Sequence, residues 1–72
     1  MGDNETARKE AQKALELSPS ANGYLVLGRV DLAENHLADA RSEADNALKL
    51  SPADSAAQEL MREVEARGGS AK

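Results

Sequence analysis

The sequence predicts an all-α protein of four antiparallel helices that pair into hairpins. Three observations lead to this prediction. Apolar residues recur at three- and four-residue steps through most of the chain, which is the period of an amphipathic helix. Ser18 and Pro19, and again Ser51 and Pro52, divide the chain into segments of helical length, because proline cannot continue a helix. A third break lies at Asn35, since Asn tolerates the left-handed conformation that ends many helices.

The first helix is expected over residues 4–17, with Asp3 or Asn4 as its N-cap. One narrow face consists mainly of small residues: Ala7, Ala11, Ala14, Leu15 and Ser18. The remaining charged side chains are expected to form a solvated face: Arg8, Lys9, Glu10, Lys13 and Glu16. Either Ser18 or Ser20 caps the helix that follows Pro19.

The second helix, over residues 21–34, is the most apolar part of the chain. Its apolar stripe is wide, which indicates a helix that is contacted on more than one side. Gly28 lies in mid-helix, where glycine costs about 1 kcal/mol relative to alanine. A close approach of a neighbouring helix at Gly28 explains this cost.

The third helix is expected over residues 37–50 and the fourth over residues 53–67. His36 lies in the turn before the third helix and is expected to be exposed. Ser51 or Asp54 begins the fourth helix, whose outer face is polar, as in a terminal helix. Gly68 and Gly69 end it and predict a flexible tail over residues 68–72.

An internal repeat is the strongest pattern in the sequence. Seven residues of the first helix and its terminus recur 33 positions later. The matching pairs are Ala7 and Ala40, Ala11 and Ala44, Ala14 and Ala47, Leu15 and Leu48, Leu17 and Leu50, Ser18 and Ser51, and Pro19 and Pro52. A period of this length with two helices per unit indicates a solenoid.

The residues of the middle unit resemble the signature of the tetratricopeptide repeat (TPR) family. Tyr24 takes the place of the Trp in that signature, and Leu27 and Gly28 match it directly. Further signature positions are occupied by Ala40, Ala44, Ala47 and Pro52, where Ala44 replaces the usual large aromatic residue. Asp31 stands where the family usually has Tyr.

The resemblance implies one complete TPR-like hairpin over residues 21–52. Residues 1–20 would be the second helix of a preceding unit, and residues 53–67 a following half-unit or capping helix. A chain that begins in mid-unit is expected to be a fragment of a longer TPR protein. The alternative fold is a compact bundle in which the same four helices close on themselves.

In TPR proteins the first helix of each pair lines a concave groove that binds peptides or partner proteins. By resemblance, five residues would face that groove: Asn22, Leu25, Arg29, Leu32 and Ala33. Leu25 and Leu32 would then be apolar groups on a surface, which marks an interaction site. The function expected is therefore non-catalytic protein interaction or scaffolding, and the alternative is self-association, such as a helix-swapped homodimer.

Composition argues against other functions. The net charge is −4, and Tyr24 is the only aromatic residue, so nucleic-acid binding is not expected. Without cysteine and with His36 as the sole imidazole, no enzyme activity, cofactor or metal site is expected. No apolar run is long enough to span a bilayer, so we expect a soluble protein, cytoplasmic by default, without membrane partners.

Overall fold

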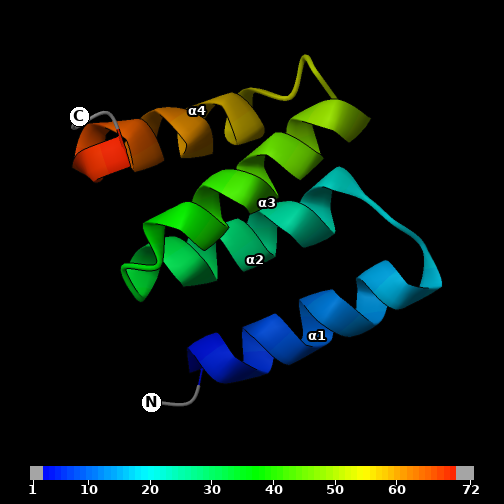
Figure 1. Ribbon diagram of the computed structural model, residues 1–72. Coiled ribbons are helices and arrows are strands. Elements are labelled where there is room, and N and C mark those ends of the chain that lie inside the picture. The colour runs from blue at the N-terminus through cyan, green and yellow to red at the C-terminus, as the bar shows by residue number, and fades with distance from the viewer. Residues whose placement is uncertain (1–2, 70–72) are drawn as a thin grey trace.

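The computed structural model describes residues 3–69, which form four helices whose consecutive members run antiparallel (Figure 1). These are α1 (Asp3–Leu17), α2 (Ala21–Ala33), α3 (Leu37–Leu50) and α4 (Ser55–Val64), followed by a π-helical turn, η1 (Glu65–Gly69). There is no β-strand among these residues, and the predicted all-α class is confirmed. None of the described helices has both the length and the hydropathy needed to cross a membrane.

Side-chain caps fix two of the helix starts. The Ser20 hydroxyl accepts a hydrogen bond of 3.1 Å from the Gly23 N–H, so Ser20 and not Ser18 caps α2. The Asp54 carboxylate accepts one of 2.9 Å from the Ala56 N–H. Of the two predicted starts of the fourth helix, Ser51 and Asp54, the structure therefore confirms Asp54 as the cap. The predicted bound at residue 53 is wrong, because Pro52 and Ala53 form a turn.

The C-terminal boundary also differs from the prediction. The α-helix ends at Val64 and continues as the wider turn η1, in which Gly68 has a φ of 156°. Such a positive φ favours glycine, so the Gly-Gly sequence ends the helix as predicted. Of the predicted tail, Gly68 and Gly69 belong to η1, and residues 70–72 lie outside the described part of the chain.

The helices stack in chain order (Figure 1). α2 packs against both α1 and α3, and α4 packs against α3 and also reaches α2. α1 contacts α2 and neither α3 nor α4. The alternative of a closed four-helix bundle is wrong for the described residues, because closure would bring α1 against α3 or α4.

The main core lies among α2, α3 and α4. Its buried residues are Leu25, Leu32, Ala40, Ala44, Ala47, Ala57, Leu60 and Val64, with Tyr24 partly buried against them. Leu27 is also buried, whereas Pro52 is exposed in the α3–α4 turn. A Cβ built on Gly28 would lie 2.5 Å from Leu60 Cδ2, so the predicted close approach at Gly28 is confirmed.

Candidate functional site

The five residues predicted to line a partner-binding groove divide into two groups. Asn22, Arg29 and Ala33 are exposed on α2. Leu25 and Leu32 are buried, with exposures of 7% and 6%. The expectation that these two leucines lie on an open surface is wrong, because they join the core cluster to which α4 also contributes.

The exposed part of the α2 face has a counterpart on α4 and η1. Arg29 and Arg62, and likewise Ala33 and Ala66, are separated by the 33-residue period, and all four are exposed. Within residues 3–69, neither arginine makes an ion pair. A shallow hollow of about 520 Å³ lies along α4 and η1, beside Arg62 and Ala66. We name Asn22, Arg29, Ala33, Arg62 and Ala66 the α2/α4 face.

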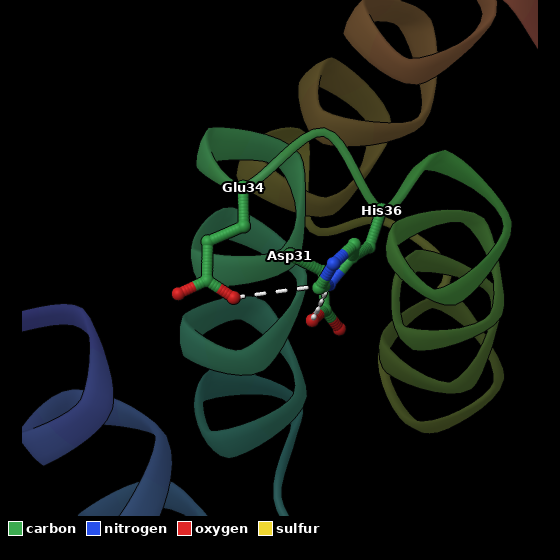
Figure 2. Close-up of side chains that lie close together, drawn as sticks. All are labelled: Asp31, Glu34 and His36. Atoms are coloured by element: carbon green, nitrogen blue, oxygen red, sulfur yellow. Dashed lines mark ion pairs between the residues drawn. The ribbon is translucent and has the colours of Figure 1, made fainter.

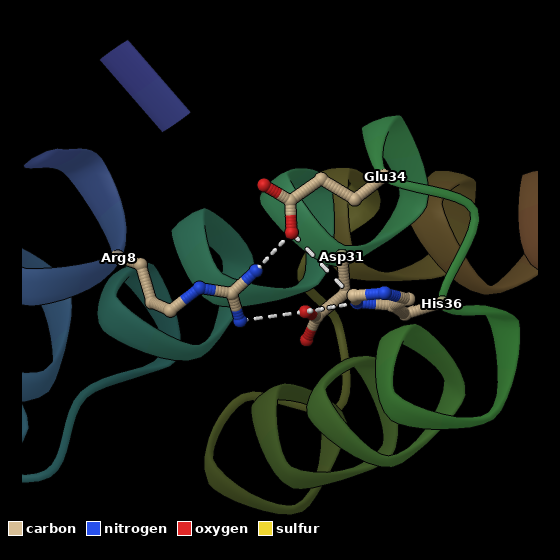
Figure 3. A network of polar contacts seen from close by, with 4 residues as sticks. All are labelled: Arg8, Asp31, Glu34 and His36. Atoms are coloured by element: carbon tan, nitrogen blue, oxygen red, sulfur yellow. Dashed lines mark hydrogen bonds and ion pairs between the residues drawn. The ribbon is translucent and has the colours of Figure 1, made fainter. Parts of the chain in front are cut away.

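A polar cluster lies at the turn between α2 and α3 (Figure 3). Arg8 reaches across from α1, and its Nη1 donates a hydrogen bond of 2.7 Å to Oδ1 of Asp31. Its Nη2 donates another, of 2.5 Å, to Oε1 of Glu34. His36 lies beside both carboxylates, with Nδ1 at 3.7 Å from Asp31 Oδ1 and 3.8 Å from Glu34 Oε1.

The turn after α2 brings His36 next to Asp31. Asn35 has a φ of 65°, the left-handed conformation that the sequence predicts for it. The His36 N–H donates to the Asp31 carbonyl at 2.7 Å, and the Asn35 N–H donates to the Leu32 carbonyl at 3.0 Å. This pair of bonds is a Schellman motif, which satisfies the last carbonyls of α2.

Asp31 is the most deeply buried charged residue of the cluster, with 2% of its surface exposed. A buried carboxylate loses its hydration, so it needs a partner of opposite charge. Arg8 is that partner, and the hydrogen bond that its guanidinium donates to Asp31 raises the pKa of Arg8. Glu43 of α3 lies near the Asp31 carboxylate. Burial, together with the negative charge of Asp31, raises the pKa of the Glu43 carboxyl group.

Asp31, Glu34 and His36 also have the donor types of a divalent-metal site (Figure 2). One ligand atom from each lies within 4.8 Å of the others. An imidazole nitrogen with two carboxylate oxygens is a donor set that suits Zn²⁺. However, Arg8 donates to Oδ1 of Asp31 and Oε1 of Glu34, the two oxygens that face His36. The guanidinium is therefore the cation that balances the site.

Sequence reasoning assigned Arg8 to a solvated face and missed its role. Arg8 and Arg41 are separated by the 33-residue period. Arg41 also pairs with an acid, since its Nη2 lies 3.3 Å from Oε2 of Glu65 in η1. The partner acids do not follow the repeat, because the residues 33 positions after Asp31 and Glu34 are Val64 and Arg67. The repeated arginine therefore does not identify its partner. His36 is exposed as predicted, with 55% of its side chain accessible.

Comparison with known proteins does not identify a family for this chain. No protein-family model matches the chain, and no curated protein or solved structure matches it significantly. The resemblance to TPR proteins therefore stays a prediction that depends on the residues of the middle unit.

Proposed function

We propose that this chain is a non-catalytic protein-interaction module, of the TPR-like scaffold type, that binds a peptide or partner protein through the α2/α4 face. The observation that carries this proposal is the repetition of exposed Arg29 and Ala33 as exposed Arg62 and Ala66. Neither arginine is used in an ion pair within the described residues, so both are available to a ligand.

Arginine is suited to recognise carboxylates, because its planar guanidinium offers two parallel hydrogen bonds. Arg62 has two acidic neighbours on the hollow, Glu59 and Glu63. Arg29 is bordered on the same face by Asn22 and Ala33, which carry no charge. We therefore assign Arg29 the main contact with a partner carboxylate.

The polar cluster supports a non-catalytic role. Arg8 holds Asp31 and Glu34 through two hydrogen bonds, and this network joins α1 to α2. A general base or nucleophile must be able to reach a substrate, but the Asp31 carboxylate is enclosed and paired. The cluster is better described as part of the fold.

Selection of peptides from a display library on the immobilised protein tests the proposal. Selected peptides should bind the wild-type protein and lose binding to Arg29→Glu and Ala33→Glu, which alter the exposed face of α2. Ala38→Glu, on an exposed position of α3, is the matched control and should bind normally. If selected peptides bind Arg29→Glu and Ala33→Glu as they bind the wild type, the α2/α4 face is not the site.

Self-association is the second candidate function, and two exposed leucines favour it. Leu17 and Leu50 are 85% and 49% exposed at the C-terminal ends of α1 and α3, which lie on the same edge of the molecule (Figure 1). Two copies could bury these leucines together. Light scattering over a concentration series should then show a dimer that Leu17→Ser with Leu50→Ser abolishes. A constant monomer mass would exclude it.

A further inference from the structure

The polar cluster at the turn between α2 and α3 contains three side chains that can bind one metal ion together (Figure 2). One ligand atom from each of Asp31, Glu34 and His36 lies within 4.8 Å of the other two. The single imidazole of the chain predicts no metal site, but the fold adds two carboxylate oxygens to it. One nitrogen and two oxygens are a sufficient set of protein ligands for Zn²⁺ when water is the fourth ligand.

The spacing of these atoms is close to that of a tetrahedral zinc site. Zn²⁺ binds imidazole nitrogen and carboxylate oxygen at about 2.0–2.2 Å, so two ligand atoms of a tetrahedron lie about 3.4 Å apart. His36 Nδ1 lies 3.7 Å from Asp31 Oδ1 and 3.8 Å from Glu34 Oε1. Shifts of a few tenths of an ångström would therefore bring His36 and the two carboxylates onto one ion.

Backbone hydrogen bonds hold the three ligands near one another. The His36 N–H donates to the Asp31 carbonyl at 2.7 Å, and the Glu34 N–H donates to the Val30 carbonyl at 3.0 Å. Asp31 lies on α2 with 2% of its surface exposed, so packing fixes its side chain. Ligands that are already ordered lose little conformational entropy when they bind a metal.

The charges of the cluster also favour a divalent cation. Arg8 supplies one positive charge and contacts both Asp31 and Glu34 (Figure 3). Glu43 of α3 adds a third carboxyl group near Asp31. An ion with two positive charges would compensate these carboxyl groups more fully than the guanidinium does.

We propose that Asp31, Glu34 and His36 bind a Zn²⁺ ion in the intact protein, and that the ion displaces Arg8 from the two carboxylates. Arg8 donates to Oδ1 of Asp31 and Oε1 of Glu34, the same oxygens that face His36. A guanidinium and a Zn²⁺ ion on the same oxygens would lie a few ångströms apart and repel each other. The Arg8 side chain is 28% exposed, so it has a path into water.

Displacement of Arg8 loosens the attachment of α1. Among the described helices α1 contacts α2 alone, and Ala11 is the only residue of α1 that is buried. The hydrogen bonds of Arg8 tie this helix to the end of α2. By thermodynamic linkage, the factor by which the Arg8 contact weakens zinc binding is the factor by which zinc weakens that contact. Zinc therefore orders the α2–α3 turn and releases α1.

Isothermal titration calorimetry of the full chain with ZnCl₂ tests the site. We expect one ion per chain, bound about tenfold or more weakly by Glu34→Gln and His36→Ala, since loss of even an outer partner of a ligand costs 10–100-fold in affinity. Both side chains are exposed, so these variants keep the fold. Glu63→Gln removes an exposed carboxylate elsewhere and is the matched control, with wild-type binding. Arg8→Met should bind zinc about tenfold or more tightly, because the competing cation is gone.

Hydrogen exchange tests the displacement of Arg8. Saturating zinc should slow the exchange of amides in the α2–α3 turn and speed the exchange of amides in α1. In Arg8→Met, zinc should slow the turn amides and leave the α1 amides unchanged.

Three results would overturn the inference. One is the absence of saturable zinc binding by the wild type, and another is equal binding by the wild type, Glu34→Gln and His36→Ala, which would identify other carboxylates as the ligands. The third is zinc binding that leaves α1 exchange unchanged or slows it, because Arg8 would then remain in place. The site is separate from the α2/α4 face, so none of these results would contradict the proposed interaction function.

Discussion

Arg8 Nη1 lies 2.7 Å from Asp31 Oδ1, and this contact joins α1 to α2 across 23 residues of sequence. It matters because α1 buries little apolar surface. Ala11 is its only buried residue in the described part of the chain, and α2 is its only neighbouring helix there. The attachment of α1 therefore depends on a charge pair as well as on packing.

Removal of the Arg8 guanidinium should destabilise the protein by about 2–3 kcal/mol. Breaking a fully buried pair costs about 3–5 kcal/mol, but Arg8 is partly exposed, which lowers the cost. Arg8→Met keeps the apolar stem and leaves Asp31 as a buried, unpaired charge. Urea denaturation followed by circular dichroism measures the loss of stability.

Two further variants make this prediction specific. Arg8→Met with Asp31→Leu should recover most of the lost stability, because no buried charge then lacks a partner. Arg41→Met removes an exposed pair with Glu65 and should cost less than about 1 kcal/mol. Equal losses for Arg8→Met and Arg41→Met would contradict the role of Asp31 burial.

The helices and their boundaries could be predicted largely from local chemistry. The predicted limits of the third helix agree with the structure at both ends, because Asn35 and Pro52 have unambiguous backbone preferences. The close approach at Gly28 was predictable for a similar reason: a glycine in mid-helix needs a neighbour that explains it. Both predictions depend on residues whose own backbone conformation determines the local structure.

The candidate site was less predictable, because it depends on which helix covers which face. The family resemblance predicts Leu25 and Leu32 on an open surface, yet α4 contributes to the cluster that buries them. Asp31 has a polar side chain on an apolar helix, and sequence alone does not show that Arg8 reaches it. Such contacts between distant segments follow from packing and not from periodicity.

Gly28→Val should destabilise the protein by about 1–3 kcal/mol, the usual range for overpacking a core. The added Cβ would lie 2.5 Å from Leu60 Cδ2 and 3.4 Å from Glu43 Cβ. The Leu60 side chain of α4 would have to move. Ala38→Val adds a β-branched residue on the exposed surface of α3 and is the matched control. A loss in urea stability no larger than that of Ala38→Val would show that the approach at Gly28 is not tight.

Glu43→Gln should stabilise the protein at neutral pH and lose this advantage in acid. Burial and the nearby Asp31 charge raise the pKa of Glu43 in the folded state. The charged form of Glu43 therefore opposes folding above that raised pKa. This destabilisation decreases as the pH falls through the raised pKa towards the ordinary pKa of glutamate, because Glu43 is protonated in the folded state before it is protonated in the unfolded state.

Urea midpoints of the wild type and Glu43→Gln, measured between neutral and acidic pH, should therefore converge as the pH falls. Glu10→Gln is the matched control, because Glu10 is the exposed counterpart of Glu43 in the repeat. It should change stability little at any pH. A difference between wild type and Glu43→Gln that grows in acid would show that the sign is wrong.

Zinc should stabilise the Arg8→Met variant more than the wild-type protein. Without the guanidinium, Oδ1 of Asp31 and Oε1 of Glu34 lose the cation to which they are hydrogen-bonded. His36 Nδ1 lies 3.7 Å from the first of these oxygens and 3.8 Å from the second. A Zn²⁺ ion would supply the missing positive charge and coordinate the imidazole, which Arg8 does not reach. Because binding to the folded state raises stability, the urea midpoint of Arg8→Met should rise with added ZnCl₂.

Two controls identify the ligands in this zinc experiment. His36→Ala in the Arg8→Met background should remove most of the zinc effect, because it deletes the only nitrogen donor of the three residues. Mg²⁺ should have little effect, since it prefers an octahedral shell of oxygen ligands and keeps several waters. If zinc raised the midpoints of the wild type, Arg8→Met and the double variant equally, it would be binding to other carboxylates. Arg8 would then not be the cation that competes with a metal for Asp31 and Glu34.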